Sequence, residues 1–308
     1  MNVHTDNSND TLETHTVLDA NNIVGESIVW DSDRQTLFWV DIIGRQIHGW
    51  NSSKNEHLSW PTPEIVTSFG LHKSGHSAVV GLRKRIALWD FDQQFSTLAN
   101  IEPDQPLNRL NEGVLGPDGA FWVGTMQDNI GIDDAPRDVT ENRGHVYKVY
   151  PDGAVIKLSD DVFGITNTMV WREDNTFIVD DTLANALYAY TLDGATGQLV
   201  NRRVYQQNFD RGLPDGSCLD ADGYVWNCRV IGGSCVARFA PDGSVDRLIE
   251  LPCSWPTSCC FGGPDLDELY VTSARFTLSD EHLARHPLEG GLFRVRPGVR
   301  GVQPFRFG

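Results

Sequence analysis

A repeated strand–turn–strand unit is the feature of this sequence that most restricts its fold. In residues 213–226, polar residues are followed by a short apolar run and the turn Asp222-Gly223. A second apolar run comes after the turn. Glycine tolerates the positive φ that such tight turns require. The sequence contains six comparable units, whose second runs are residues 37–40, 77–80, 121–124, 177–180, 224–226 and 269–272.

The six units share a polar residue at the matching point of their first run. These residues are Glu26, Thr67, Asn111, Asn167, Asp215 and Ser258, and they are separated by 41, 44, 56, 48 and 43 positions. A repeat of about 40–50 residues with several strands per unit indicates a β-propeller. A third run follows each second one, and a more polar fourth segment, such as 200–206 or 245–251, completes most units. We therefore predict an all-β, six-bladed β-propeller with four antiparallel strands per blade around a central channel.

The repeats run from about residue 22 to the end of the 308-residue chain, which favours one propeller domain over residues 13–308. Residues 1–12 are polar and have no apolar stretch of the kind found in secretion signals, so we expect a disordered tail and a cytoplasmic protein. A propeller must close its ring by pairing one end of the chain with the last blade. Residues 14–20 and 301–308 are both candidates for this closing strand.

Charge and cysteine content narrow the range of partners. The chain has 25 Lys and Arg against 42 Asp and Glu, a net charge of −17, which opposes nucleic acid or an anionic membrane as a partner. This charge suits a neutral small molecule that becomes an acid, and we expect a monomer. The six cysteines lie between residues 218 and 260 without zinc-finger spacing, which predicts free, largely buried thiols.

The topology of a four-stranded blade places the six polar positions at one mouth of the channel. The same face carries the loops between second and third strands, two of which are long, residues 127–143 and 275–289. Long loops in compact domains are commonly lids or binding loops. The first offers Asp128 and Asn129 as groups that could bind hydroxyls. The second predicts a short helix carrying His282 and His286, which has no third metal ligand and therefore favours a surface helix.

The chemistry of the polar positions suggests a cation site. Glu26 and Asp215 supply hard carboxylate oxygens and Asn167 an amide oxygen, a set that suits a divalent ion with exchangeable waters. Such an ion polarises carbonyl groups and lowers the pKa of bound water. Arg109 is either an anchor for substrate oxygens or the ion-pair partner of Glu112, and the polar ring itself could merely hydrate the channel. The sequence has no Gly-x-Ser-x-Gly motif, which gives little support to a nucleophilic serine.

Several motifs together resemble the senescence-marker-protein/gluconolactonase family of regucalcin-like sugar lactonases. They are Gly25-Glu26-Ser27, Arg109-Leu110-Asn111-Glu112-Gly113, Gly124-Thr125-Met126, Thr166-Asn167, Pro214-Asp215-Gly216 and the run from Thr257 to Gly263. The resemblance implies a six-bladed propeller with one divalent ion held by Glu26, Asn167 and Asp215. It also implies that Arg109 and Asn111 hold the sugar. Family members often place an acidic residue shortly after Gly-Thr-Met, and either Asp128 or Asn129 takes that place here.

The resulting hypothesis is a carboxylic-ester hydrolase that opens an aldonolactone to its aldonic acid with a metal-activated water. Asp215 would be both a metal ligand and the catalytic proton acceptor. The metal could be Ca, Zn, Mn, Mg or Fe(II), and the lactone could be a pentono- or hexonolactone. Two alternatives remain: a propeller that binds calcium or a protein partner without turnover, and an aryl-ester or organophosphate hydrolase on the same fold.

Overall fold

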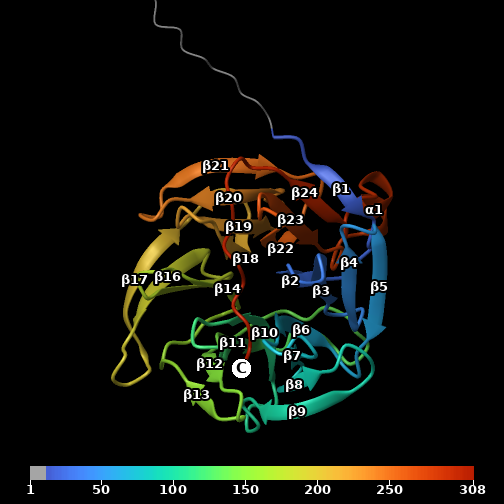
Figure 1. The fold of residues 1–308 in the computed structure, drawn as a ribbon. Coiled ribbons are helices and arrows are strands. Elements are labelled where there is room, and N and C mark those ends of the chain that lie inside the picture. Colours follow the sequence, from blue (N-terminus) through green and yellow to red (C-terminus); the bar gives the residue numbers. More distant parts are fainter. Residues whose placement is uncertain (1–11) are drawn as a thin grey trace, which may run out of the picture.

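The computed structural model describes residues 12–308 and contains six four-stranded antiparallel sheets arranged in a ring (Figure 1). The predicted six-bladed β-propeller is therefore confirmed. The expected tail, residues 1–12, lies outside the described residues except for Leu12, which packs against the core of the last blade. No helix within residues 12–308 is long and apolar enough to cross a membrane.

The first five blades each use four strands that are consecutive in the chain. Blade one consists of β2 (Gly25–Asp31), β3 (Thr36–Asp41), β4 (Gln46–Asn51) and β5 (Glu56–Pro61). Blade two consists of β6 (Val66–Leu71), β7 (Ala78–Leu82), β8 (Arg85–Trp89) and β9 (Phe95–Asn100). Blade three consists of β10 (Asn108–Leu115), β11 (Phe121–Gln127), β12 (Val146–Val149) and β13 (Val155–Lys157).

The remaining blades complete the ring. Blade four consists of β14 (Thr166–Trp171), β15 (Thr176–Asp181), β16 (Ala186–Leu192) and β17 (Leu199–Gln207). Blade five consists of β18 (Leu213–Leu219), β19 (Val225–Val230), β20 (Cys235–Phe239) and β21 (Val245–Glu250). Blade six consists of β22 (Pro256–Gly262), β23 (Glu268–Ser273) and β24 (Leu292–Val295), with β1 (His15–Leu18) as its outer strand.

The N-terminal segment closes the ring. Strand β1 pairs with β24 in antiparallel register, with His15 opposite Arg294 and Leu18 opposite Leu292, and the two strands lie side by side in Figure 1. Residues 301–308, the other candidate, instead cross one end of the channel. There the backbone of Phe307 bonds with Leu71 and Lys73 of blade two, and Gly308 N donates to Gly119 O of blade three.

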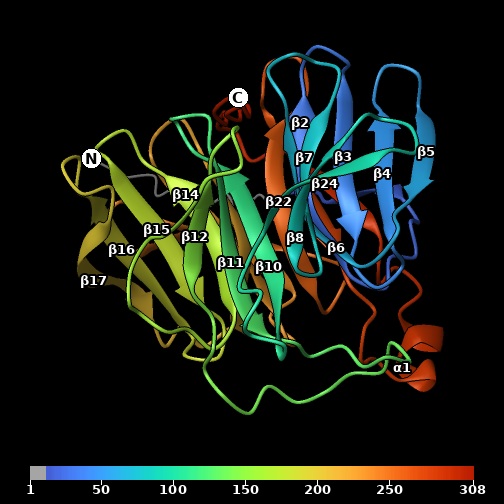
Figure 2. The same ribbon diagram turned by 90° about the horizontal axis from the view of Figure 1, so that it is seen from below.

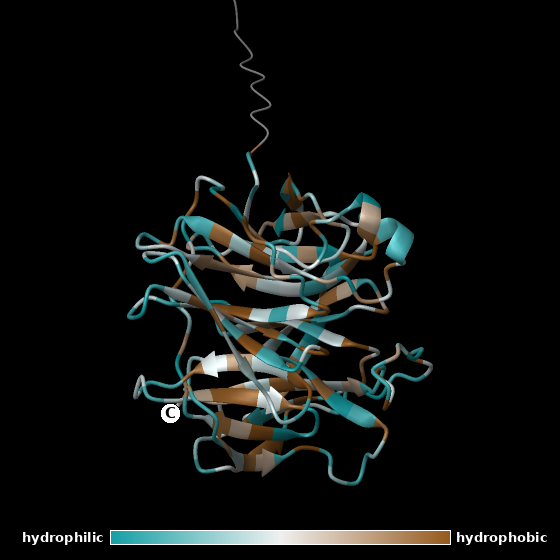
Figure 3. Ribbon diagram, turned by 90° about the vertical axis from the view of Figure 1, so that its right-hand side faces the viewer, coloured by the Kyte–Doolittle hydropathy of each residue, from teal (hydrophilic) through white to brown (hydrophobic). Residues whose placement is uncertain are grey.

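Burial follows the position of each strand in its blade. The second strands, such as β3 and β15, are buried along their whole length because neighbouring blades cover both of their faces, whereas the outer strand β5 is largely exposed. Apolar clusters fill the spaces between blades around the ring, with Trp30, Trp39, Trp89, Trp122 and Trp226 among the largest buried side chains. Hydropathy is accordingly high along the strands and low in many of the loops (Figure 3).

Two further sequence predictions agree with the structure. All six cysteines are free, and all but Cys218, which is half-buried, are buried. The loop 275–289 contains α1 (Asp280–Arg285), capped by the Ser279 side chain, which accepts from His282 N. Helix α1 and the loop 127–143 lie on the same face of the ring, opposite the C-terminal segment (Figure 2).

The role of β1 leads to the first prediction. A variant that starts after residue 18 loses β1 and exposes the edge of β24 together with Leu292 and Phe293, which are fully buried. We expect its Tm to fall by about 2–12 °C, the scale of a loss of 1–3 kcal/mol in a domain of this size. Calorimetry should compare it with a variant that lacks only residues 2–11. Equal melting temperatures would show that β1 does not hold the ring closed.

Candidate functional site

The inner strand of every blade carries a β-bulge near its start. The pairing register shifts between Glu26 and Val29 in β2 and between Asn167 and Met169 in β14, and equivalent shifts occur in β6, β10, β18 and β22. Ser27 and Thr168, which follow Glu26 and Asn167, have positive φ values of 50° and 42°. A bulge re-aims the neighbouring side chain. The predicted polar positions therefore lie where each inner strand bends at the channel.

Four of the six polar positions line a single pocket at the predicted mouth of the channel. The pocket has a volume of about 270 Å³, and its polar side chains include Glu26, Asn111, Asn167 and Asp215 together with Arg109. Thr67 and Ser258 do not line it. Thr67 contacts Ser68 and the Gly81 carbonyl, Ser258 faces a second cavity, and Thr257 takes the corresponding place in the mouth pocket.

A chain of hydrogen bonds joins the polar residues of blades three and four. Arg109 Nη1 donates to Asn111 Oδ1 over 2.7 Å, and Asn111 Nδ2 donates to Asn167 Oδ1 over 2.8 Å. Asn167 Nδ2 then donates to the Thr182 hydroxyl over 3.0 Å. Asn111 Nδ2 also donates to the Thr166 carbonyl, so both of its N–H groups are occupied. These bonds fix the orientation of both amides relative to the pocket.

Arg109 does not pair with Glu112, so that interpretation of the sequence was wrong. Its guanidinium is buried and bonds Asn129 Oδ1 through Nε and Nη2, at 3.1 and 2.8 Å, and the Leu110 carbonyl through Nη1. Burial lowers the pKa of Arg109 to about 10, which leaves it charged at neutral pH. Glu112 points instead into the second cavity, deeper in the channel.

The structure separates the two candidates that follow Gly-Thr-Met. Asn129 lines the mouth pocket and bonds Arg109. Asp128 is turned toward Arg83, whose Nε donates to Asp128 Oδ2 over 2.8 Å, and its other oxygen accepts from Ile130 N. Asp128 approaches Arg109 only to 3.9 Å. Of these two adjacent side chains, Asn129 is therefore the one available to a ligand in the pocket.

The two carboxyl groups of the pocket are buried close to each other. Burial raises the pKa of Glu26, and the nearby Glu112 raises it further. Burial and the neighbouring Glu26 carboxylate likewise raise the pKa of Asp215. Within residues 12–308, neither carboxylate lies within 4.0 Å of a basic side chain. Two buried acids that form no ion pair within 4.0 Å in this part of the chain fit a divalent cation, which would favour the ionised form of both.

The donor types agree with this fit. No group of three or more His, Cys, Asp or Glu side chains arranged to hold a metal occurs among residues 12–308, so the third donor must be of another kind. Asn167 lines the same pocket and directs an amide oxygen toward Asn111, with a second lone pair unused. Glu26, Asp215 and Asn167 thus form an all-oxygen set that suits a hard cation.

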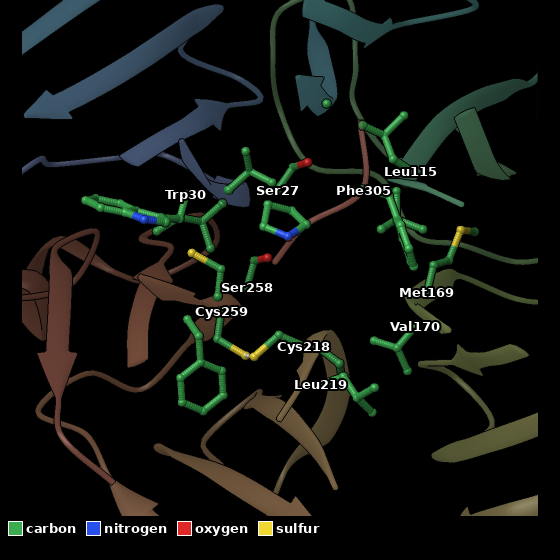
Figure 4. A pocket seen from close by; sticks show the side chains of 18 of the residues that line it. Ser27, Trp30, Leu115, Met169, Val170, Cys218, Leu219, Ser258, Cys259 and Phe305 are labelled. Atoms are coloured by element: carbon green, nitrogen blue, oxygen red, sulfur yellow. Dashed lines mark hydrogen bonds between the residues drawn. The ribbon is translucent and has the colours of Figure 1, made fainter. Parts of the chain in front are cut away.

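The second cavity lies at the opposite end of the channel. It has a volume of about 140 Å³ and is lined mainly by apolar side chains such as Trp30, Leu115 and Met169, with Phe305 of the C-terminal segment (Figure 4). Cys218 and Cys259 point toward each other there, with 3.5 Å between their sulfur atoms. Burial raises the pKa of the Cys218 thiol. This cavity lacks the polar donors of the mouth pocket.

The two histidines of α1 do not join the candidate site. His282 Nε2 lies 3.0 Å from Glu289 Oε1 and 3.2 Å from the Ser254 hydroxyl, and its ring stacks on that of His286. None of these side chains lines the mouth pocket. This placement agrees with the predicted helix at the surface rather than with a metal site.

Sequence reasoning missed several residues of the pocket. Ile42, Ile43, Thr182 and Ile231 reach it from short loops between second and third strands, and Trp255 reaches it from a link between blades. The same topological rule that singled out the two long loops places these short connections on the mouth face as well. The topological rule could therefore have found these residues, but it was applied only to the two long loops.

These features define a class of protein: a six-bladed propeller with a pocket of carboxylate, amide and guanidinium groups at one end of its channel. Residues 24–275 match the family model described as "SMP-30/Gluconolactonase/LRE-like region", and the chain belongs to this family.

Relatives and solved structures match nearly the whole chain. Regucalcin from Xenopus laevis is 37% identical over 289 residues, covering 92% of this chain and 94% of the relative. The crystal structure of a calcium-binding protein, regucalcin, from Agrobacterium tumefaciens has a TM-score of 0.87 at 27% identity, covering 96% of this chain and 98% of the other. A luciferin-regenerating enzyme has a TM-score of 0.86 at 27% identity, with coverage of 96% and 99%.

The second prediction concerns metal uptake. Because Glu26 and Asp215 are buried acids that form no ion pair within 4.0 Å among residues 12–308, metal-stripped protein should take up about one divalent ion per chain. Glu26→Gln and Asp215→Asn should weaken uptake, since each removes a charge from the pocket. Elemental analysis after dialysis measures both effects. Asp128→Asn is the matched control, because it removes a carboxylate that lies outside the pocket; equal losses in all three variants would contradict the assignment.

Proposed function

We propose that this protein is a metal-dependent sugar lactonase, a carboxylic-ester hydrolase that opens an aldonolactone to the free aldonic acid. The observation that carries the proposal is the convergence of Glu26, Asn167 and Asp215 with Arg109 and Asn129 in one pocket of about 270 Å³. Membership in a family whose description includes gluconolactonase supports the same reaction. A pocket of this size suits a single sugar ring rather than a polymer.

The hydrogen-bond inventory of the pocket indicates how a lactone would be held. Arg109 uses four of its five N–H groups within residues 12–308, which leaves one Nη2 hydrogen for a ligand. Asn129 accepts through its oxygen, so its amide N–H groups are available as donors. Asn111 has no N–H to spare and can only accept. Arg109 and Asn129 would donate to substrate oxygens, while Asn111 would accept from a hydroxyl.

The apolar walls of the pocket would cover the carbon skeleton of the ring. Trp255, Phe276 and Ile130 line the pocket around the polar base, and Ile130 and Phe276 belong to the two long loops. Aromatic and aliphatic surfaces exclude water and strengthen the electrostatic interactions at the base. These loops would therefore position the lactone above the carboxylates.

Hydrolysis requires a polarised carbonyl and an activated water. A divalent ion held by Glu26, Asn167 and Asp215 would supply both effects, because such ions act as Lewis acids and lower the pKa of bound water. Asp215 would also accept the proton of the attacking water. Ring opening converts a neutral lactone into an anion, and Arg109 is the buried cation of the pocket that can stabilise the developing negative charge.

A calcium-binding function without turnover is the second candidate. The observation that favours it is the similarity to the solved protein named as calcium-binding regucalcin. The same oxygen ligands would hold calcium in both cases. The two candidates differ in whether the space beside the ligands is used by a substrate, which only turnover can decide.

The third prediction tests the proposal directly. Purified protein should hydrolyse aldonolactones in a panel that also contains aryl esters and an organophosphate. Activity should disappear after removal of metal and return when a divalent ion is added. Release of acid, followed by a pH indicator, measures the rate. Tight binding of calcium with no hydrolysis of any panel member would favour the binding function, and selective hydrolysis of aryl esters would replace the sugar substrate.

The fourth prediction concerns Asp215. Asp215→Asn nearly preserves volume and keeps one coordinating oxygen, but it removes the charge and the proton acceptor. We expect the variant to fold, to bind metal more weakly and, under saturating metal, to lose about a hundredfold or more in kcat, the usual scale of general-base catalysis. Steady-state kinetics over a range of metal concentrations measures both effects. Full recovery of kcat at high metal would mean that Asp215 is a ligand only.

A further inference from the structure

The amide of Asn167 presents a choice that the pocket has to resolve. An asparagine side chain carries an oxygen that accepts and a nitrogen that donates, and rotating the amide by 180° exchanges them. Only the oxygen can face a cation. The orientation of this side chain therefore decides whether the pocket offers three oxygen donors or two.

Arg109, the first residue of this chain of hydrogen bonds, determines the direction in which each bond is donated. Arg109 can only donate, so Asn111 must turn its oxygen toward Arg109. Asn111 Nδ2 consequently faces Asn167 and requires an acceptor, which Asn167 Oδ1 provides at 2.8 Å. The nitrogen of Asn167 then needs an acceptor on its other side.

Thr182 provides that acceptor, and its hydroxyl can donate the next hydrogen bond in the same direction. Its hydroxyl oxygen lies 3.0 Å from Asn167 Nδ2, and the hydroxyl can donate to Asp180 Oδ1, 3.5 Å away. Thr182 lines the mouth pocket, whereas Asp180 is fully buried on β15. The chain of hydrogen bonds therefore runs from Arg109, which can only donate, to Asp180, whose Oδ1 accepts. Each side chain between them has one orientation in which all its hydrogen bonds are made.

The buried carboxyl of Asp180 stands at the end of this chain of hydrogen bonds. Asp180 Oδ2 is buried and has no hydrogen-bond partner within residues 12–308. Asp180 lies opposite Asn167 in the pairing of β14 with β15, so the two residues are direct neighbours across the two strands. The acceptor for Thr182 thus lies on β15, the strand that pairs with β14, which carries Asn167.

We propose that Thr182 is a positioning residue for the cation site: its hydroxyl holds the Asn167 amide with the oxygen available to an ion bound by Glu26 and Asp215. The inference rests on the proposed metal-dependent function and concerns a residue outside the ligand set. Outer-shell partners of this kind typically change metal affinity by 10–100-fold when they are removed.

The backbone around Thr182 allows a clean substitution. Thr182 N donates to Ile165 O, and Thr182 O accepts from Asn185 N, so the local turn is held by main-chain bonds that any side chain permits. Thr182→Val replaces the hydroxyl by a methyl group of nearly equal volume, and Thr182→Ser keeps the hydroxyl. The pair separates the hydrogen bond from packing.

The experiment titrates metal-stripped protein with Mn²⁺, and in parallel with Ca²⁺, by calorimetry for wild type and each variant. Thr182→Val should lose 10–100-fold in affinity, while Thr182→Ser should stay within about threefold of wild type. Thr62→Val is the matched control, because it removes an equally buried hydroxyl that bonds the Glu64 carbonyl away from the pocket. Thr62→Val should leave the affinity unchanged.

The possible failures are distinguishable. Wild-type affinity in Thr182→Val, with weakened binding in Glu26→Gln and Asp215→Asn, overturns the role of Thr182 and leaves the proposed function standing. Equal losses in Thr182→Val and Thr182→Ser would show that keeping the hydroxyl does not preserve affinity and that packing at this position matters instead, which also overturns it. Wild-type protein that binds neither ion overturns both the inference and the proposed metal dependence.

Discussion

Closure of the ring is the constraint on which the rest of the structure depends. The six blades are separate sheets with no shared ladder, so apolar side chains between neighbouring blades hold them together. The cohesion is continuous only if the last blade is complete, and β1 completes it by pairing with β24. Because this pairing joins the two ends of the repeat, Glu26 of blade one can share a pocket with Asp215 of blade five.

Within that ring, the bulges of the inner strands turn a repeated backbone into a specific site. A regular strand would alternate side chains between its two faces, but the register shift after each polar position locally changes that alternation. All six blades have the bulge, yet only four of the six positions line the mouth pocket. The backbone thus provides six equivalent positions on the inner strands, and the residue type at each position decides whether it carries a charge.

The repeat period and its polar positions were enough to predict the fold and four polar residues of the pocket, Glu26, Asn111, Asn167 and Asp215, because both depend on spacing along the chain. Closure could not be predicted, since residues 14–20 and 301–308 both suit an edge strand and only the pairing with β24 decides. Asn129 and Asp128 could not be told apart because their directions depend on Arg83 and Arg109, which are distant in sequence. The contact of Thr182 with Asn167 was missed because the sequence does not show that the Thr182 hydroxyl accepts from the Asn167 amide.

The two ends of the channel differ in the groups that they offer to a ligand. At the end opposite the mouth, the C-terminal segment bonds to blades two and three and lines the second cavity. Burial in this mainly apolar cavity raises the pKa of Glu112 to about 7. At the mouth, Arg109 and the chain of amides surround the buried acids with polar partners. A polar ligand loses its hydration in either cavity, and at the mouth the unused N–H groups of Arg109 and Asn129 offer hydrogen bonds in return. Under the proposed function, these donors would hold the sugar oxygens at the mouth, in the same pocket as Glu26 and Asp215.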